Sequence, residues 1–365
     1  MSKVNLMHIS IRCDGQNIHC DFYENTAVMT MKEKHISNRR KRITKIIAVV
    51  LLILLAYLVL GYLYSFKVIS LPDRSAKELD EVPESYYETI DRDGTIERFD
   101  YQTGSLTKTA YIYLPYGYDE NDVQTKYDIF YLMHGGGGSE SGYLGTENDD
   151  RDLKRILDNM IANGDIQPTI VVTPTFYRSD DTRSEGELTK SFKNELVSEL
   201  IPAVEQKYHT YAETTDYDGL KASRMHRSFG GVSMGSVTTW YTFMDCLDYF
   251  KFYLPMSGDC WSCGMLGGLD FPHAVTAASL NHAVSRQGYT SEDFYIYAAT
   301  GTEDIAHNVL SAQMNSMKLH KKTFQFAEDF SHGNVHFDVA NEYEHDYPAM
   351  MVYLYTGLRM FEAVK

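Results

Sequence analysis

The chain has 365 residues, of which 44% are hydrophobic and 23% charged, so it is long enough for one large domain with a buried core. Glycine and proline occur in ordinary proportion, which excludes collagen-like and wholly disordered chains. Residues 1–65 carry a net charge of +5, and because the whole chain carries −16, residues 66–365 carry −21. A body this acidic repels phosphate backbones, so we expect no nucleic-acid partner.

Residues 46–66 contain no charged side chain. As a helix they would span about 31 Å, close to the hydrocarbon thickness of a bilayer, so we expect a transmembrane helix there. The basic run NRRKRITK directly precedes them, which predicts a cytoplasmic tail at 1–45 and an extracellular location for everything after residue 66. A cleaved signal peptide and a buried core helix are the alternatives, but the run is long, lacks an A-x-A-like site and is apolar on every face.

The five cysteines fall on both sides of the expected membrane span. Cys13 and Cys20 lie in the expected cytoplasmic tail, and Cys246, Cys260 and Cys263 follow the span. Cys260 and Cys263 form a lone C-x-x-C pair, whereas a structural zinc site needs four ligands. We therefore expect no metal, and the pair is predicted to be either a local disulfide or two unpaired thiols.

A polar stretch at 67–85, with Pro72 and Pro83, predicts a linker between the membrane span and a folded domain at 86–365. Within that domain, hydrophobic patterns of strand and helix type alternate. The predicted strands are 95–100 and 108–114, which form a hairpin, and 128–134, 169–173, 227–232, 251–256, 293–299 and 335–340. The predicted helices are 149–164, 187–208 with a kink at Pro202, 235–247, 306–319 and 347–361. Such alternation predicts an α/β domain with a mainly parallel sheet covered by helices on both faces.

The sharpest motif is G-x-S-x-G at 231–235, between a predicted strand and a predicted helix. A nucleophile on a tight strand-to-helix turn crowds its neighbours, so the positions two before and two after it need glycine. The turn raises the Ser233 hydroxyl above the sheet edge, and the N-terminus of the following helix favours developing negative charge. Ser233 is therefore the predicted nucleophile.

Four glycines follow His134 directly after the predicted strand 128–134. Glycines let backbone N–H groups approach a substrate carbonyl, so this loop is the expected source of one oxyanion donor. We predict the N–H groups of Gly136 and Met234 as the oxyanion hole. A flexible loop or a phosphate cradle is the alternative, but no G-K-[ST] sequence follows.

An acid and then a base must follow the serine in chain order. Asp304 lies in the turn after the strand 293–299, at the expected carboxyl edge of the sheet, and is the predicted acid. Asp259 is the competitor, one strand earlier, and Glu303 is expected to point elsewhere. A helix N-cap is the alternative role for Asp304.

Four histidines compete for the role of base. His336 lies inside a predicted strand, His320 at a basic helix end and His332 in a polar turn. His345 follows the last predicted strand and precedes the last predicted helix, a position from which a loop histidine reaches the serine. It is the predicted base.

These motifs resemble the feruloyl esterases of carbohydrate esterase family 1, particularly the esterase modules attached to bacterial xylanases. The matching pieces extend over about 86–362 and include YIYLPYGYDE, YLMHGGGGSE, NGDIQPTIVVTPTF, ASRMHRSFGGVSMGS and the GTEDIA turn. The resemblance implies an α/β-hydrolase fold, a triad of Ser233, Asp304 and His345, and an ester substrate from plant cell walls. The N-terminal tail and span depart from those modules, as does Cys260, where they tend to carry an aromatic residue.

The expected activity is a serine ester hydrolase that needs no cofactor and acts on a feruloylated polysaccharide or a small ester. Trp261 is the predicted stacking partner for a phenolic acyl group or a sugar, and a packed core position is its alternative. An esterase for acetylated sugars, thioester-like metabolites or siderophore lactones, an acyltransferase, and a non-catalytic carbohydrate-binding envelope protein are the alternative functions. The oligomeric state stays open.

Overall fold

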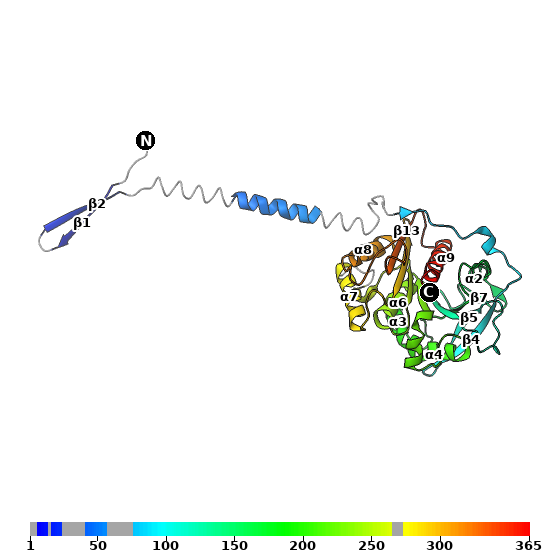
Figure 1. Ribbon diagram of the computed structural model, residues 1–365. Helices are drawn as coiled ribbons and strands as arrows, with labels where there is room; N and C mark the ends of the chain where they lie inside the picture. Colours follow the sequence, from blue (N-terminus) through cyan, green and yellow to red (C-terminus); the bar gives the residue numbers. More distant parts are fainter. Residues whose placement is uncertain (1–5, 14–15, 24–40, 57–75, 265–272) are drawn as a thin grey trace. The chain divides into compact units, whose positions relative to one another are not determined.

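The computed structural model describes residues 6–13, 16–23, 41–56, 76–264 and 273–365. The chain divides into two compact units, Met1–Ser70 and Leu71–Lys365 (Figure 1). Each unit is described by itself.

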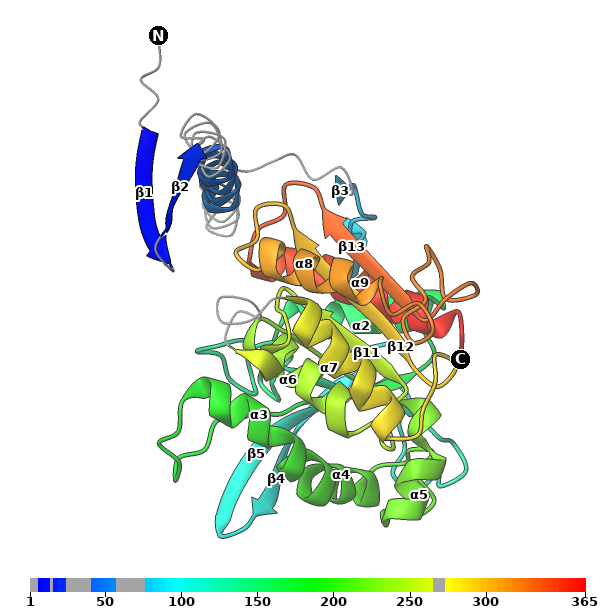
Figure 2. The same cartoon turned by 90° about the vertical axis from the view of Figure 1, so that its left-hand side faces the viewer.

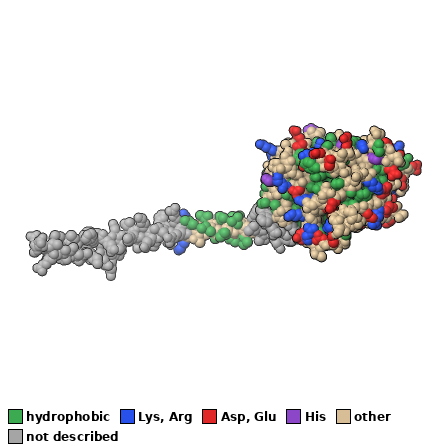
Figure 3. Space-filling view, turned by 90° about the horizontal axis from the view of Figure 1, so that it is seen from below, with side chains coloured by type: hydrophobic (Ala, Val, Ile, Leu, Met, Phe, Trp, Pro, Cys, Tyr) green, Lys and Arg blue, Asp and Glu red, His purple; other side chains and the backbone are tan. Residues whose placement is uncertain are grey.

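The first unit contains an antiparallel hairpin and a helix. Strands β1 (Leu6–Cys13) and β2 (Gln16–Tyr23) pair along their whole length, which the sequence patterns did not predict. Residues 41–56 are helical, and their side chains are exposed and mainly hydrophobic (Figure 3). No helix within the described ranges has both the length and the apolar character needed to cross a bilayer. Residues 57–66, the second part of the predicted span, lie outside the described residues.

In the second unit, the described residues include nine strands that form one sheet in the order β3-β13-β12-β11-β10-β6-β9-β5-β4. Neighbouring strands are parallel from β3 through β9, and β5 pairs antiparallel with both β9 and β4. The strands are β3 (Ala76–Lys77), β4 (Thr95–Thr103), β5 (Leu106–Leu114), β6 (Asp128–Met133), β9 (Thr169–Thr173), β10 (Arg227–Val232), β11 (Phe252–Met256), β12 (Tyr295–Gly301) and β13 (Val335–Ala340). A separate two-stranded pair joins β7 (Gly145–Thr146) and β8 (Asp149–Asp150).

Helices cover both faces of this sheet (Figures 1 and 2). The helices are α2 (Asp152–Asn163), α3 (Glu185–Glu195), α4 (Ile201–Lys207), α5 (Tyr217–Ala222), α6 (Met234–Asp245), α7 (His273–Arg286), α8 (His307–Met317) and α9 (Tyr347–Glu362). One hydrophobic core lies between the sheet and the face that carries α3, α6, α7 and α8, and a second core joins the sheet to α2 and α9. The mainly parallel, helix-covered sheet predicted from the sequence is therefore present.

The predicted kink at Pro202 takes the form of a π-helical turn. Residues Leu196–Leu200 widen the helix between α3 and α4, and the Ile201 N–H donates to the Leu196 carbonyl five residues earlier. Proline has no N–H to donate to the carbonyl four residues before it, and its ring crowds that carbonyl. The wide turn directly before Pro202 accommodates both effects.

Among the differences from the sequence expectations in the second unit, two have a clear physical cause. Helix α7 was not predicted, because its sequence HAVTAASLNHAVSR is rich in small and polar residues and lacks a strong apolar stripe. Residues 76–85, expected in the linker, pack on the domain instead. Strand β3 joins the sheet beside β13, and the Val82 side chain is buried. Lys77 in β3 pairs with the buried Asp338 at 2.6 Å, which explains why this polar segment holds to the sheet edge.

Candidate active site

Ser233 lies on a strained turn between β10 and α6. Its backbone has φ 57° and ψ −117°, a conformation that L-residues rarely adopt. A Cβ at Gly231 would come 2.6 Å from the Gly235 backbone, and one at Gly235 would come 2.2 Å from the Met133 carbonyl. Both flanking glycines are therefore required for the turn to close. The Ser233 N–H donates to the Met256 carbonyl at 3.0 Å, which fixes the turn to β11.

The glycine loop after β6 holds two of its amides within the protein. The Gly137 N–H donates to the Tyr177 hydroxyl at 2.7 Å, and the Gly138 N–H donates to the Gly135 carbonyl at 3.1 Å. The Gly136 N–H has no acceptor among the described residues. It is thus available to a substrate oxygen.

Gly136 and Met234, the two predicted oxyanion donors, are neighbours. A Cβ at Gly136 would lie 3.1 Å from Cγ of Met234, and a Cβ at Gly135 would lie 3.3 Å from Cβ of Ser233. Met234 is the first residue of α6, so its N–H has no carbonyl partner within the helix. Two N–H groups therefore lie beside the serine, and the N-terminus of α6 adds its partial positive charge.

His134 holds the start of the glycine loop in place. Its Nδ1 lies 2.7 Å from the Gly135 carbonyl oxygen and its Nε2 2.7 Å from the Thr175 hydroxyl. Burial lowers the pKa of this imidazole, although the bond to Gly135 opposes that effect. A neutral ring that donates from Nδ1 and accepts at Nε2 satisfies both contacts, so His134 orients the loop and stays uncharged.

Asp304 and His345 come from two different loops and form a hydrogen-bonded pair. His345 Nδ1 lies 2.8 Å from Asp304 Oδ1, which also accepts from the Ala306 N–H at 2.7 Å. The Asp304 side chain is fully buried, whereas that of His345 is 24% exposed. Burial opposes ionisation of Asp304, but the His345 ring and the nearby Ser257 hydroxyl hold the pKa of the carboxyl below its ordinary value. Asp304 is therefore ionised beside the imidazole.

The loops that carry this pair are joined by backbone contacts. The Glu303 N–H donates to the Tyr343 carbonyl at 3.1 Å, next to Asp304 on one loop and two residues before His345 on the other. A Cβ at Gly301 would come 1.9 Å from that carbonyl oxygen, so the close approach requires glycine at this position. These contacts hold the Asp304 carboxylate within hydrogen-bond distance of the His345 imidazole.

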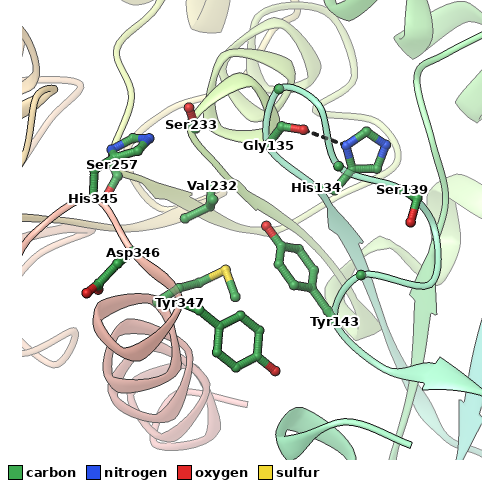
Figure 4. Close-up of a pocket in the computed structure, with 14 residues that line it drawn as sticks. His134, Gly135, Ser139, Tyr143, Val232, Ser233, Ser257, His345, Asp346 and Tyr347 are labelled. Carbon is green, nitrogen blue, oxygen red and sulfur yellow. Dashed lines mark hydrogen bonds between the residues drawn. The ribbon is translucent and has the colours of Figure 1, made fainter. Parts of the chain in front are cut away.

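A cavity of about 330 Å³ brings the serine and the histidine together (Figure 4). Ser233 and His345 both line it, and in Figure 4 they lie at one end while Tyr347 lies towards the other. The remaining lining residues come from the glycine loop, the end of β10, the turn after β11 and the start of α9: His134, Gly135, Gly136, Gly138, Ser139, Gly142, Tyr143, Val232, Ser257, Asp346 and Met350. The lining combines polar side chains such as Ser257 with apolar and aromatic ones such as Val232 and Tyr143, a mixture typical of small-molecule sites.

The three histidines that were set aside lie elsewhere in the domain. His336 is buried in β13 and pairs with Asp338 at 2.7 Å. His332 is exposed and lies 2.8 Å from Asp329. His320 follows α8 and does not line the cavity. Of the four candidate histidines, only His345 shares the cavity with Ser233.

Asp259 and Trp261 form a separate contact. The Trp261 indole donates to Asp259 Oδ1 at 3.1 Å, and the ring packs 3.6 Å from the Cβ position of Gly186. Asp259 is buried, which raises its pKa to about 6. Neither residue lines the cavity that holds Ser233, although Glu185, next to Gly186, borders Gly136. The predicted stacking ring of Trp261 therefore lies outside this cavity, next to the start of α3, and the competitor acid Asp259 accepts a hydrogen bond from it.

The cysteines that the structure describes with their side chains are free thiols: Cys246, Cys260 and Cys263. Of the two alternatives for Cys260 and Cys263, the unpaired thiols are the observed one. Cys260 is fully buried, which raises its pKa to about 12 and leaves it protonated. Among the described residues, no group of three or more histidine, cysteine or acidic side chains is placed to hold a metal ion.

Several side chains of the site have no motif that reveals them. Ser257 follows β11 with φ 52° and lines the cavity beside Asp304. Tyr177 accepts from the loop amide of Gly137 and donates to Glu185. The position of Ser257 just after β11, the strand beside β10, is only a weak sequence signal of a role in the site. Tyr177 gives no such signal, because its partner Gly137 is distant in sequence.

Comparisons with known proteins agree with this geometry. A family model described as "Putative esterase" matches residues 106–356. The endo-1,4-beta-xylanase Y of Acetivibrio thermocellus is 40% identical over 287 residues, which cover 79% of this chain and 25% of that protein. The chain thus spans about a quarter of the length of this curated relative.

Two solved structures of esterases are also similar to this chain. A serine-to-alanine mutant of the feruloyl esterase module from Clostridium thermocellum, in complex with sinapinate, is 39% identical with a TM-score of 0.70, and the match covers 81% of this chain and 98% of that one. A ferulic acid esterase from the anaerobic fungus Anaeromyces mucronatus is 18% identical with a TM-score of 0.55, covering 79% of this chain and 100% of that one. The second likeness bears on the fold alone.

Proposed function

Because the chain belongs to the "Putative esterase" family, we propose that it is a serine carboxylic ester hydrolase, specifically a feruloyl esterase that releases hydroxycinnamates from plant cell-wall arabinoxylan. The observation that carries this proposal is the 2.8 Å hydrogen bond between Asp304 and His345, because the His345 ring lines the same cavity as the strained Ser233. This combination supplies a nucleophile, a base and an orienting acid in one place.

In the first half of the reaction, Ser233 Oγ attacks the ester carbonyl and His345 Nε2 takes its proton. The Nδ1–H of His345 is committed to Asp304, so Nε2 is left as the basic nitrogen. The ionised Asp304 then stabilises the imidazolium that forms. The negative charge on the carbonyl oxygen is met by the N–H groups of Gly136 and Met234, each worth about 3 to 4 kcal/mol in a transition state.

In the second half, the tetrahedral intermediate collapses and the alcohol leaves with the proton from His345. An acyl-enzyme on Ser233 remains, and water that gives its proton to His345 attacks it. The same two amides stabilise the second intermediate, which collapses to release the acid while His345 returns the proton to Ser233 Oγ.

The substrate class is supported by the relatives and by the aromatic surroundings. The solved feruloyl esterase module, with bound sinapinate, aligns over 81% of this chain. Tyr143 and Tyr347 line the cavity, and Trp261 lies near the glycine loop through Glu185. Flat aromatic rings of this kind suit a phenolic acyl group or a sugar, and we assign Trp261 to substrate binding on that ground.

The test is hydrolysis of methyl ferulate and p-nitrophenyl acetate by the wild-type protein and by Ser233→Ala. We expect ferulate release by the wild type and a loss of roughly 10⁶-fold in kcat for the variant, as for other triad serines. Rapid acetate turnover without ferulate release would redirect the proposal to small-acyl esters. Retained activity in Ser233→Ala would remove the nucleophile assignment.

We also propose that residues 46–66 anchor the protein in the cell membrane, with the esterase domain outside. The support is a chain segment without charge, a basic run before it, and exposed apolar side chains along the described helix 41–56. Protease added to intact cells should remove the domain and spare residues 1–45. Recovery of the protein in the salt-washed supernatant of lysed cells would contradict the anchor.

A further inference from the structure

A second cavity, of about 240 Å³, lies between helices α3, α6 and α7. Helices α3 and α7 both pack against α6, the helix that begins at the nucleophile (Figure 2). The cavity is smaller than the roughly 300–1,000 Å³ of pockets that enclose drug-sized ligands, so it suits one monosaccharide residue. We call it the basic cavity.

Basic side chains dominate the lining of this cavity. Lys190 and Lys193 come from α3, and His282 and Arg286 come from α7. Asp245 is the acidic side chain in the lining, and it pairs with Lys193 and, at 2.5 Å, with Arg286. One carboxylate therefore serves two cations, while Lys190 is exposed and has no ion pair with any described residue.

This excess of positive charge stands out on a domain whose net charge is strongly negative. Acidic side chains occur over much of the face seen in Figure 3, with basic ones among them. The pKa of Lys193 is lowered by burial, and the neighbouring Arg286 and Lys190 lower it further. An anion bound among these cations would relieve their mutual repulsion.

The lining also contains a hydroxyl that lacks a partner. The Tyr241 side chain is only 6% exposed, lines the cavity, and makes no hydrogen bond with the residues that the structure describes. The Tyr241 hydroxyl is open to the cavity rather than sealed in the core, so it can donate to a ligand oxygen there. Ser262 and Ser279 add further hydroxyls. Hydroxyl groups around a cationic centre match a sugar that carries a carboxylate.

We propose that the basic cavity binds the carboxylate and ring hydroxyls of a uronic acid residue on the polysaccharide that carries the ester. This inference rests on the proposed function, since it names a subsite for the same polymer. Lys190 is exposed and without an ion pair to the described residues, and Arg286 is half exposed, so we assign these two side chains to the carboxylate and Tyr241 to a ring hydroxyl.

The position of the basic cavity suits a subsite away from the scissile bond. Tyr241 follows Ser233 by eight residues on α6, which is about 12 Å along the helix axis. Ser262 in the lining directly follows Trp261, the ring assigned to the substrate. A chain of a few sugars can therefore occupy the cavity while its ester reaches the serine.

The test uses the full-length protein and two feruloylated xylo-oligosaccharides that differ only by one glucuronic acid residue, with methyl ferulate as the reference. We expect a lower KM for the uronate-bearing ester. Lys190→Glu should raise that KM by about threefold to tenfold and leave the neutral ester and methyl ferulate unchanged, the size expected for one solvent-accessible charge. The difference should shrink at high salt. Lys321→Glu makes the same charge change in an exposed turn outside the cavity and serves as the matched control.

A second arm measures binding without turnover. Calorimetry with a glucuronic-acid-substituted xylo-oligosaccharide that lacks the ester should give heat with the wild type and less with Lys190→Glu. Free ferulate and inorganic phosphate are titrated in parallel, and Lys190-dependent binding of either one without binding of the uronate would overturn the proposal. Equal KM values for the two oligosaccharide esters would overturn it as well. Absence of methyl ferulate hydrolysis would instead refute the proposed function, and the calorimetric arm would still decide the basic cavity.

Discussion

The two ends of strand β10 show how one element serves stability and chemistry. At its start, Arg227 is 1% exposed and forms two hydrogen bonds to Glu205, at 2.6 and 2.8 Å. Its other N–H groups reach the carbonyls of Leu220 and Tyr249 and the hydroxyl of Ser223. At its end, Ser233 has a strained backbone and faces a cavity.

The difference follows from what each end must do. A buried charge is tolerated only when its hydrogen bonds are complete, so the start of β10 is saturated with partners. A reacting site needs donors and a nucleophile that await a substrate. The amides of Met234, at the end of β10, and of Gly136, on the loop beside it, accordingly have no acceptor among the described residues. Damage at the start should therefore unfold the protein, and damage at the end should stop the reaction in a folded protein.

The largest effect after removal of the serine itself is expected at Asp304. Asp304→Asn should lower kcat by about 10⁴-fold, because the amide disturbs the tautomer and no longer stabilises the imidazolium of His345. Methyl ferulate hydrolysis and a thermal unfolding scan check this together. If the active site serves the reaction and not the stability of the fold, the melting temperature of Asp304→Asn should change far less than its rate of hydrolysis.

Asp259→Asn is the matched control for that change. It makes the same substitution in a buried aspartate one strand earlier, and the amide oxygen can still accept from the Trp261 indole. We expect less than a tenfold change in kcat. A loss as large as that of Asp304→Asn would show that the acid has been misassigned.

The opposite end of β10 is tested by Arg227→Met. The substitution leaves Glu205 buried with its charge uncompensated, which should cost about 3 to 5 kcal/mol of unfolding free energy. The kcat of the fraction that remains folded should stay within a few fold of the wild type. Chemical denaturation measures the unfolding free energy, and active-site titration gives the concentration of folded enzyme from which kcat is calculated.

A double variant sharpens this test. Arg227→Met combined with Glu205→Gln removes the uncompensated charge and should recover part of the lost stability. If the double variant is no more stable than the single one, the ion pair is not what holds this end of the strand.

The smallest expected effect is a pH dependence from Asp259. Its folded pKa of about 6 lies above its ordinary value of 3.8, so the folded state holds the proton more tightly. The resulting stabilisation is complete well below pH 4 and is lost as the pH rises through about 6. Relative to the wild type, Asp259→Asn should gain about 2 kcal/mol between pH 4 and pH 7. A difference in unfolding free energy that stays flat across this range would contradict the buried carboxyl.

The sequence predicted the elements that contain a catalytic motif or have a clear hydrophobic period. The G-x-S-x-G turn, the glycine loop and the strand-end positions of Asp304 and His345 follow from rules that act within a few residues. The partner of Arg227 could not be predicted, because Glu205 lies on another element and only the fold brings them together.

Other features depend on the folded surroundings in the same way. Helix α7 has a weak apolar stripe and is held by packing against α6 and α8. Strand β3 has two residues and exists because Lys77 meets the buried Asp338. The basic cavity requires side chains from three helices, and Ser257 becomes part of the site only through the pairing of β11 with its neighbours.

The most direct test of the central claim is covalent labelling with a fluorophosphonate, followed by peptide mass spectrometry. We predict one adduct, on Ser233, formed rapidly by the wild type and by Arg227→Met that remains folded, and far more slowly by Asp304→Asn. A label on another residue, or the same labelling rate in Asp304→Asn as in the wild type, would contradict the account.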